Sequence, residues 1–117
     1  MNINDLTIGD ARQLATLFGK ATAAPHPMVG KYVICRCYSA GVHAGVLVSQ
    51  TGDEAILRDS RRLWSWVAKG GVALSGLSQY GLKSGKIDTL LPEIALTGVI
   101  ETIPTTRGAE ESIRDAA

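Results

Sequence analysis

Between Lys31 and Trp66 the chain alternates apolar and polar residues in short runs that turn residues separate. In the first run the side chains fall on two faces, with Val33, Cys35 and Cys37 on one and Tyr32, Ile34, Arg36 and Tyr38 on the other. Strict alternation of this kind predicts a β-strand whose two faces meet different surroundings.

Three further runs follow, at 42–49, 54–58 and 61–67. Gly45 permits a kink in the first of them, and Asp59-Ser60 interrupts the pattern between the other two. The connections at 39–41 and 51–53 are too short for parallel crossovers. The pattern therefore predicts bent antiparallel strands in a meander.

Residues 5–19 carry apolar side chains at helical spacing, with Thr7 as the N-cap and Gly19 at the C-terminal end. The apolar stripe consists of Ile8, Ala11, Leu14, Ala15 and Phe18. We expect a helix that caps the sheet, and a helix that binds a partner is the alternative. The linker 20–30, in which two prolines flank His26, is expected to be extended.

The pattern after Trp66 is weaker. We expect a short helix over 74–80, a polar loop over 83–92, strand over 93–104 and a last short helix capped by Thr106. The three-residue spacing of Leu74, Leu77 and Tyr80 supports the first helix. The late strand is either one bent strand or two short ones that divide near Thr97-Gly98.

These elements predict an α+β, mainly β fold, namely a small, strongly bent antiparallel barrel with an N-terminal helix and short additional helices. A chain of 117 residues is expected to form one domain. Within it we assign a helix 5–19, a linker 20–30, a barrel 31–104 with an insertion 67–92, and a C-terminal tail or helix 105–117.

The formal charge is +1, from 12 Lys and Arg against 11 Asp and Glu, which gives no long-range attraction to nucleic acid or to a membrane. No apolar run approaches the ~20 residues that span a bilayer, and the acidic N-terminus is not a signal peptide. We therefore expect a soluble protein. Cys35 and Cys37 are too far apart along a strand for a disulfide, so we expect reduced, buried thiols and no metal or other cofactor.

The candidate chemistry lies in two motifs, SAGVHAG and RRLWSW. No phosphate loop, nucleophile elbow or zinc-ligand spacing is present, so the sequence predicts no enzyme. Glycines beside His43 let a ligand approach the backbone closely, and an arginine with a tryptophan can hold a nucleotide by its phosphate and its base. The candidate ligand-binding residues are His43, Arg61, Arg62, Trp64 and Trp66.

Alternation places Arg62, Trp64 and Trp66 on one face of their strand, and we expect the two motifs to meet on one surface. Each candidate also has a purely structural interpretation. His43 is then a surface loop residue, and one tryptophan fills the core or a subunit interface with an arginine over it. An enzyme that uses His43 or a cysteine would need a partner group that the sequence does not identify.

Three stretches carry a resemblance to known proteins: NDLTIGDARQLATLFG, GKYVICRCYSAGVHAGVLVSQTGDEAILRDSRRLWSW and EIALTGVIETIP. They resemble a family of small uncharacterised proteins of tailed phages and prophages, most sharply in SAGVHAG, RRLW and VIETIP. The resemblance implies a phage accessory protein that acts in the host bacterial cytoplasm. The order of elements is also similar to an Sm-like barrel, in which edge strands pair between subunits and small RNAs or nucleotides bind. The stretch 66–92 departs from that pattern.

We therefore expect a phage-encoded, non-enzymatic binding protein that acts as a homo-oligomer against a host defence system. Its partner is either a small or cyclic nucleotide signal that it sequesters or a host defence protein that it blocks. The alternatives are an RNA- or DNA-binding Sm-like barrel, which the near-neutral charge disfavours, and a minor structural or assembly protein of the virion.

Overall fold

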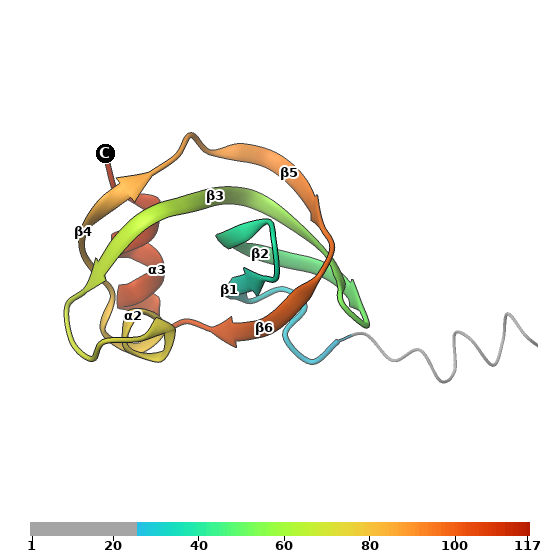
Figure 1. Ribbon diagram of the computed structural model, residues 1–117, viewed down its shortest axis with the longest axis horizontal. Helices are drawn as coiled ribbons and strands as arrows, with labels where there is room; N and C mark the ends of the chain where they lie inside the picture. The colour runs from blue at the N-terminus through green and yellow to red at the C-terminus, as the bar shows by residue number, and fades with distance from the viewer. Residues whose placement is uncertain (1–25) are drawn as a thin grey trace, which may run out of the picture.

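The computed structural model describes residues 26–117, which contain six strands and two helices (Figure 1). The strands are β1 (Tyr32–Cys37), β2 (Gly41–Thr51), β3 (Glu54–Ala68), β4 (Leu82–Ile87), β5 (Leu91–Leu96) and β6 (Val99–Pro104). The helices are α2 (Leu74–Tyr80) and α3 (Arg107–Arg114). The helix predicted over 5–19 and most of the linker predicted over 20–30 lie outside the described residues.

All the strand pairs are antiparallel, as the short connections predict. The hydrogen-bonded path runs β4-β3-β2-β1-β6, and β5 pairs separately with β3. Residues 55–60 of β3 pair with β5, whereas residues 63–68 pair with β4. The long strand β3 therefore holds two short strands in tandem, and Figure 1 shows it arching over β1 and β2.

No hydrogen-bonded ladder among residues 26–117 closes this sheet into a barrel. Strand β5 pairs with β3 and β6 pairs with β1, and β5 and β6 form no ladder with each other. Beside that connection, Tyr38 N donates to Gly98 O at 2.8 Å and Val99 N donates to Asp53 O at 2.9 Å. The fold is a small, mainly β, curved antiparallel sheet with two short helices.

Two irregularities lie side by side in β2 and β3. The register between these strands shifts at Gly45, and Asp59 adopts a positive φ of 51°. A Cβ atom on Gly45 would lie 2.9 Å from Arg58 O and 3.1 Å from the Cα atom of Ser60, so the close approach requires glycine. Gly45, where the sequence permits a kink, is thus the site of a register shift, and the predicted break at Asp59-Ser60 is a bulge inside one continuous strand.

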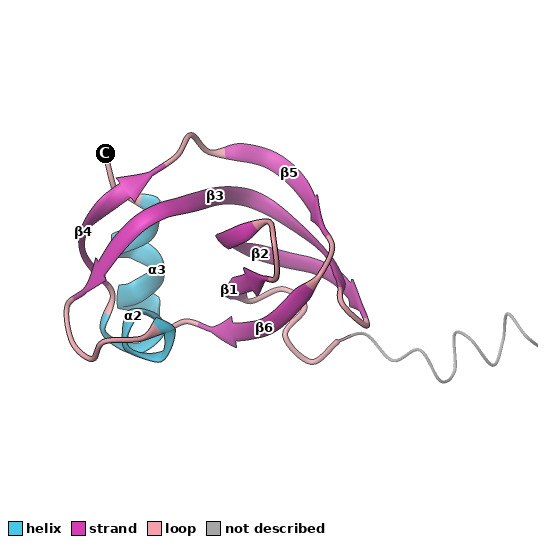
Figure 2. Cartoon of the chain, viewed as in Figure 1, coloured by secondary structure: helices cyan, strands magenta, loops and turns pink. Residues whose placement is uncertain are grey.

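The sheet buries both faces of β1. The face under α2 and α3 contributes to a cluster of Tyr32, Ile34, Ala44, Val46, Leu63, Leu74, Leu77, Leu82, Ile87 and Ile113, called the helix-side cluster. The opposite cluster consists of Val33, Cys35, Cys37, Leu47, Ala55, Leu57, Leu96 and Val99. The two faces predicted for the first run are thus confirmed, with both cysteines buried and not disulfide-bonded. Figure 2 shows the two helices together at one end of the sheet.

The elements after β3 are confirmed in part. Helix α2 has the predicted bounds, the late strand divides at Thr97-Gly98, and Thr106 Oγ1 caps α3 by accepting from Ala109 N at 3.2 Å. The polar loop predicted over 83–92 is wrong, because β4 and the start of β5 lie there. Four of the six residues of β4 are exposed, so its sequence lacks an alternating pattern. No helix within residues 26–117 is long and apolar enough to cross a membrane.

Candidate functional site

Trp64 lies at a bulge where β3 pairs with β4. Leu63 pairs with Ile87 and Ser65 pairs with Lys86, so Trp64 is an extra residue with no partner on β4. The bulge leaves the indole in solvent, and Trp64 is 75% exposed. A tryptophan this exposed forgoes the burial that usually stabilises it, which makes it a candidate contact residue.

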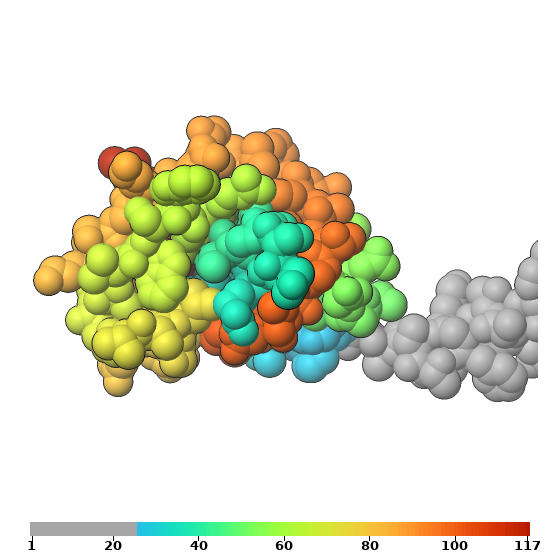
Figure 3. Space-filling view, in the orientation of Figure 1, coloured from blue at the N-terminus to red at the C-terminus, as the bar shows by residue number. Residues whose placement is uncertain are grey.

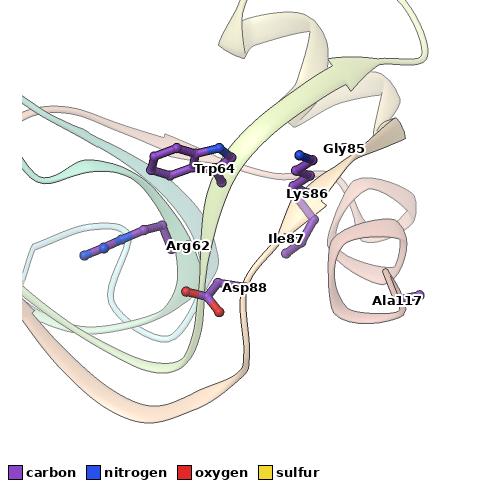
Figure 4. A pocket seen from close by; sticks show the side chains of 7 residues that line it. All are labelled: Arg62, Trp64, Gly85, Lys86, Ile87, Asp88 and Ala117. Atoms are coloured by element: carbon purple, nitrogen blue, oxygen red, sulfur yellow. The ribbon is translucent and has the colours of Figure 1, made fainter.

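An open groove of about 560 Å³ runs beside Trp64. Its lining residues are Arg62, Trp64, Gly85, Lys86, Ile87, Asp88 and Ala117. Figure 4 shows Arg62, Trp64 and Asp88 projecting toward the same side of β3. The guanidinium of Arg62 makes no ion pair within residues 26–117. The groove therefore combines an exposed aromatic ring with two cations and one carboxylate.

A smaller pocket of about 180 Å³ adjoins the groove and is lined by His43, Arg62, Asp88, Thr89, Leu91 and Ile94. Arg62 and Asp88 line both hollows, so the two form one continuous surface. His43 lies opposite Arg62 in the strand register, and Figure 3 shows the β1–β2 connection (teal) between β3 (yellow-green) and β6 (orange-red). The two motifs thus lie on paired strands, with His43 opposite Arg62. That they form one ligand-binding surface stays a prediction.

His43 is buried, with 1% of its surface exposed, and is not the surface residue of the structural interpretation. Its Nε2 lies 2.8 Å from Ala40 O, and because a carbonyl only accepts, Nε2 carries the proton. Burial lowers the pKa of His43; the hydrogen bond to Ala40 opposes this effect and the charge of Arg62 adds to it. The ring is therefore neutral at about pH 7, and its Nδ1 is an unprotonated acceptor.

Arg61 does not belong to this surface, because it is only 7% exposed. Its Nε donates to Asp88 O at 2.9 Å, and its Nη2 donates to Ile87 O at 3.3 Å. Its Nη1 donates to Ile113 O at 2.9 Å and to Ala116 O at 2.6 Å. The expectation that Arg61 contacts a ligand is therefore wrong, since backbone carbonyls occupy all three of its nitrogens.

Trp66 is separated from Trp64. The extra residue at the bulge interrupts the alternation, so Trp66 packs against the helix-side cluster together with Leu63. It borders a different hollow, of about 320 Å³, beside Leu74 and Ile103. The prediction that Trp64 and Trp66 share one face is wrong, and Trp66 is a packing residue.

Sequence reasoning misses Lys86 and Asp88, which line the groove beside Arg62 and Trp64. Both lie within the stretch 83–92 that the sequence predicted to be a polar loop. The signal that marks them is Ile87, a single apolar residue between two charged ones, which is buried and leaves both neighbours exposed. A single buried position such as Ile87 is too short a pattern to identify β4 as a strand when its pairing with β3 is not known.

Within residues 26–117 no group of three or more His, Cys, Asp or Glu side chains could hold a metal ion. Burial raises the pKa of Cys35 to about 11 and also raises the pKa of Cys37. Thiols with raised pKa values in an apolar cluster are poor nucleophiles. The groove itself presents an exposed indole, two cations and one carboxylate, which are groups that can stack, pair with charge and form hydrogen bonds.

A comparison with protein families matches residues 30–113 to DUF6948, a domain of unknown function. The chain belongs to the DUF6948 family. The matched segment contains every residue that lines the groove except Ala117. No curated protein and no solved structure matches the chain.

Proposed function

We propose that this DUF6948 protein is a non-enzymatic binding protein that holds a nucleotide in the groove beside Trp64. In this arrangement the base stacks on the indole of Trp64, and Arg62 and Lys86 bind the phosphate. The observation that carries the proposal is the bulge, which holds Trp64 75% exposed next to a guanidinium that has no ion-pair partner within residues 26–117.

The energies of such contacts are sufficient for binding. Stacking one base on an aromatic side chain contributes roughly 1–3 kcal/mol, and a hydrogen bond to a charged group contributes about 1.5–3 kcal/mol. The groove volume of about 560 Å³ lies within the ~300–1,000 Å³ of small-molecule sites. A net charge of +1 and the carboxylate of Asp88 favour a small ligand over a long polyanion, which makes RNA or DNA the less favoured alternative.

The role that we propose is counter-defence: a phage-encoded protein in the host bacterial cytoplasm sequesters a small or cyclic nucleotide signal. The resemblance of SAGVHAG, RRLW and VIETIP to phage proteins supports this setting. A host defence protein is the second candidate partner, because an exposed tryptophan beside an arginine is also the composition of an interface hot spot.

We further propose that β5 and β6 act as one bent strand that completes a small Sm-like barrel, and that the protein forms homo-oligomers. The backbone hydrogen bonds on either side of Thr97-Gly98 support the first point. Strands β4 and β6 are the two ends of the hydrogen-bonded path in the described residues, so each offers an unpaired edge to another subunit. Native mass spectrometry tests the assembly, and a monomer at working concentration would contradict it.

The binding proposal is tested with a Trp66→Phe protein, in which Trp64 is the single fluorescent tryptophan. Titration with AMP, GMP and cyclic dinucleotides should quench its fluorescence in a saturable way, because the base stacks on the indole. Trp64→Ala, studied by calorimetry, and Arg62→Ala should each weaken binding at least about tenfold.

Two exposed residues outside the groove supply matched controls. Tyr38→Ala removes an aromatic side chain that is 86% exposed. Arg58→Ala removes an exposed arginine of β3, the strand that also carries Arg62. Both should leave the affinity unchanged. Absence of binding by every nucleotide, together with no nucleotide released from the purified protein on heating, rules the proposal out.

A further inference from the structure

The pocket beside the groove contains a hydrogen-bond acceptor that no described residue uses. Nε2 of His43 is held by Ala40 O, whereas Nδ1 has no hydrogen-bond partner among residues 26–117. In that range the enclosed side-chain polar atoms without a partner are the hydroxyls of Tyr32 and Ser60. Because the ring lines the pocket and Nε2 is engaged by Ala40 O, Nδ1 is the ring nitrogen left for a ligand there.

The acceptor is fixed in place before any ligand arrives. The bond to Ala40 selects the tautomer and the direction of the ring, and burial at 1% exposure prevents the imidazole from turning outward. Leu91 and Ile94 supply apolar walls to the same pocket. In such surroundings an acceptor strongly favours a ligand group that donates a hydrogen bond to it.

We propose that the pocket lined by His43 selects the ligand, with Nδ1 accepting a hydrogen bond from an amino group on the ring of a nucleotide base. The inference rests on the nucleotide-binding function proposed above and names its specificity. Arg62 lies opposite His43 in the register, and Trp64 follows Arg62 by two residues. Diagonal neighbours on antiparallel strands are about 7–8 Å apart, so one nucleotide can reach both the indole and the imidazole.

The lone pair on Nδ1 excludes bases that present a carbonyl oxygen or no substituent at this place. A carbonyl oxygen at the same place would face the lone pair of the nitrogen, and a base without any group there would leave the acceptor unpaired once water is displaced. The volume of about 180 Å³ is below the ~300–1,000 Å³ of a complete small-molecule site. The pocket therefore takes one part of the ligand, and the groove takes the rest.

The test compares nucleotides that differ by one amino group: AMP with purine riboside 5′-monophosphate, and GMP with inosine 5′-monophosphate. Quenching of Trp64 fluorescence in the Trp66→Phe protein gives each affinity. We expect the amino-bearing member of at least one pair to bind about tenfold more tightly. Equal affinities within both pairs overturn the inference about His43 and leave the nucleotide groove standing. Absence of binding by these four nucleotides and by cyclic dinucleotides, together with no nucleotide released on heating, overturns both.

His43→Leu removes the acceptor, so it should abolish the difference in affinity between the two members of a pair. A preference that survives in a folded His43→Leu protein overturns the inference. Because this buried substitution can prevent folding, nitrogen-15 NMR of the wild-type protein provides a second readout. The Nδ1 resonance of His43 should move toward that of a hydrogen-bonded nitrogen when the preferred nucleotide is added, and an unchanged resonance in a saturated sample overturns the inference.

Discussion

Arg61 and Arg62 are consecutive residues of β3 and project to opposite faces of the sheet. Arg61 is 7% exposed and donates to carbonyl oxygens at the C-terminal end of α3, whereas Arg62 is exposed and lines both hollows of the candidate site. The alternation of side chains along a strand accounts for this separation. One arginine therefore holds the fold together, and its neighbour is available to a ligand.

Replacing Arg61 with Ala should lower the free energy of unfolding by about 2–4 kcal/mol, because several backbone carbonyls lose their donor. Arg61→Lys should recover only part of the loss, since one ammonium group cannot reach carbonyls on both β4 and α3. Urea unfolding, followed by tryptophan fluorescence, measures the effect. Arg62→Ala is the matched control and should change stability by less than about 0.5 kcal/mol. Similar losses at the two positions would contradict the separate roles.

Gly45→Ala should destabilise the protein by about 1–3 kcal/mol, because the new methyl group would overlap Arg58 O and push β2 from β3. Thermal unfolding measures the loss. Gly108→Ala is the control: a Cβ atom there meets nothing within 4 Å, and the residue lies in α3. That substitution should be neutral or stabilising, since alanine favours helix over glycine. A Gly45→Ala protein that is as stable as the wild type would show that β2 and β3 can move apart at Gly45 at little cost.

Cys35 should resist alkylation in the folded protein. Burial raises the pKa of its thiol to about 11, while a hydrogen bond with Thr102 opposes the rise. At about pH 8 only about one thiol in a thousand is then ionised, and the residue has 0% exposure. Iodoacetamide labelling followed by mass spectrometry should show little modification of Cys35 until guanidinium chloride unfolds the chain. Rapid labelling of the native protein would contradict a buried thiol.

The stability of the fold should fall on acidification through the range in which His43 titrates. Burial lowers the pKa of His43 in the folded state, whereas the unfolded chain titrates near 6.5. The unfolded state therefore binds a proton first, so this contribution to stability is complete above about pH 7 and declines as the pH falls below the unfolded pKa. Arg62 opposes protonation of the ring, and Asp88 is the carboxylate that lines the same pocket.

The measurement is denaturant unfolding of the wild-type protein and of His43→Gln over about pH 7 to 5. The glutamine variant should lose less stability on acidification, because it has no imidazole to protonate. If the free energy of unfolding falls equally with pH in the two proteins, the burial of His43 contributes nothing to the pH dependence.

Local patterns predicted the first three strands because their apolar residues are concentrated in the strands themselves. Residues 32–35 form a continuous apolar run that is buried on both faces of β1. Helix α2 and the cap at Thr106 follow from spacing and from a single side-chain contact. By contrast, β4 buries only Leu82 and Ile87, so its identity as a strand depends on pairing with β3.

The candidate site was predicted in part for the same reason. His43, Arg62 and Trp64 come from adjacent strands of one hairpin, so their proximity follows from the meander. The bulge at Trp64 cannot be read from β3 alone, because an extra residue exists only relative to a partner strand. Its effect is to separate Trp66 from Trp64. The burial of Arg61 depends on acceptors that lie more than 50 residues away.

The hydrogen bonds of Arg61 also constrain the order in which the domain can assemble during synthesis. Its acceptors Ile113 and Ala116 lie 52 and 55 residues downstream. Strands β1 to β3 leave the ribosome well before these acceptors, and until they emerge the guanidinium keeps its water, because burying an unpaired charge is costly. The helix-side cluster can therefore close only after α3 has been made, because α3 supplies both the Ile113 side chain of the cluster and a carbonyl acceptor for Arg61.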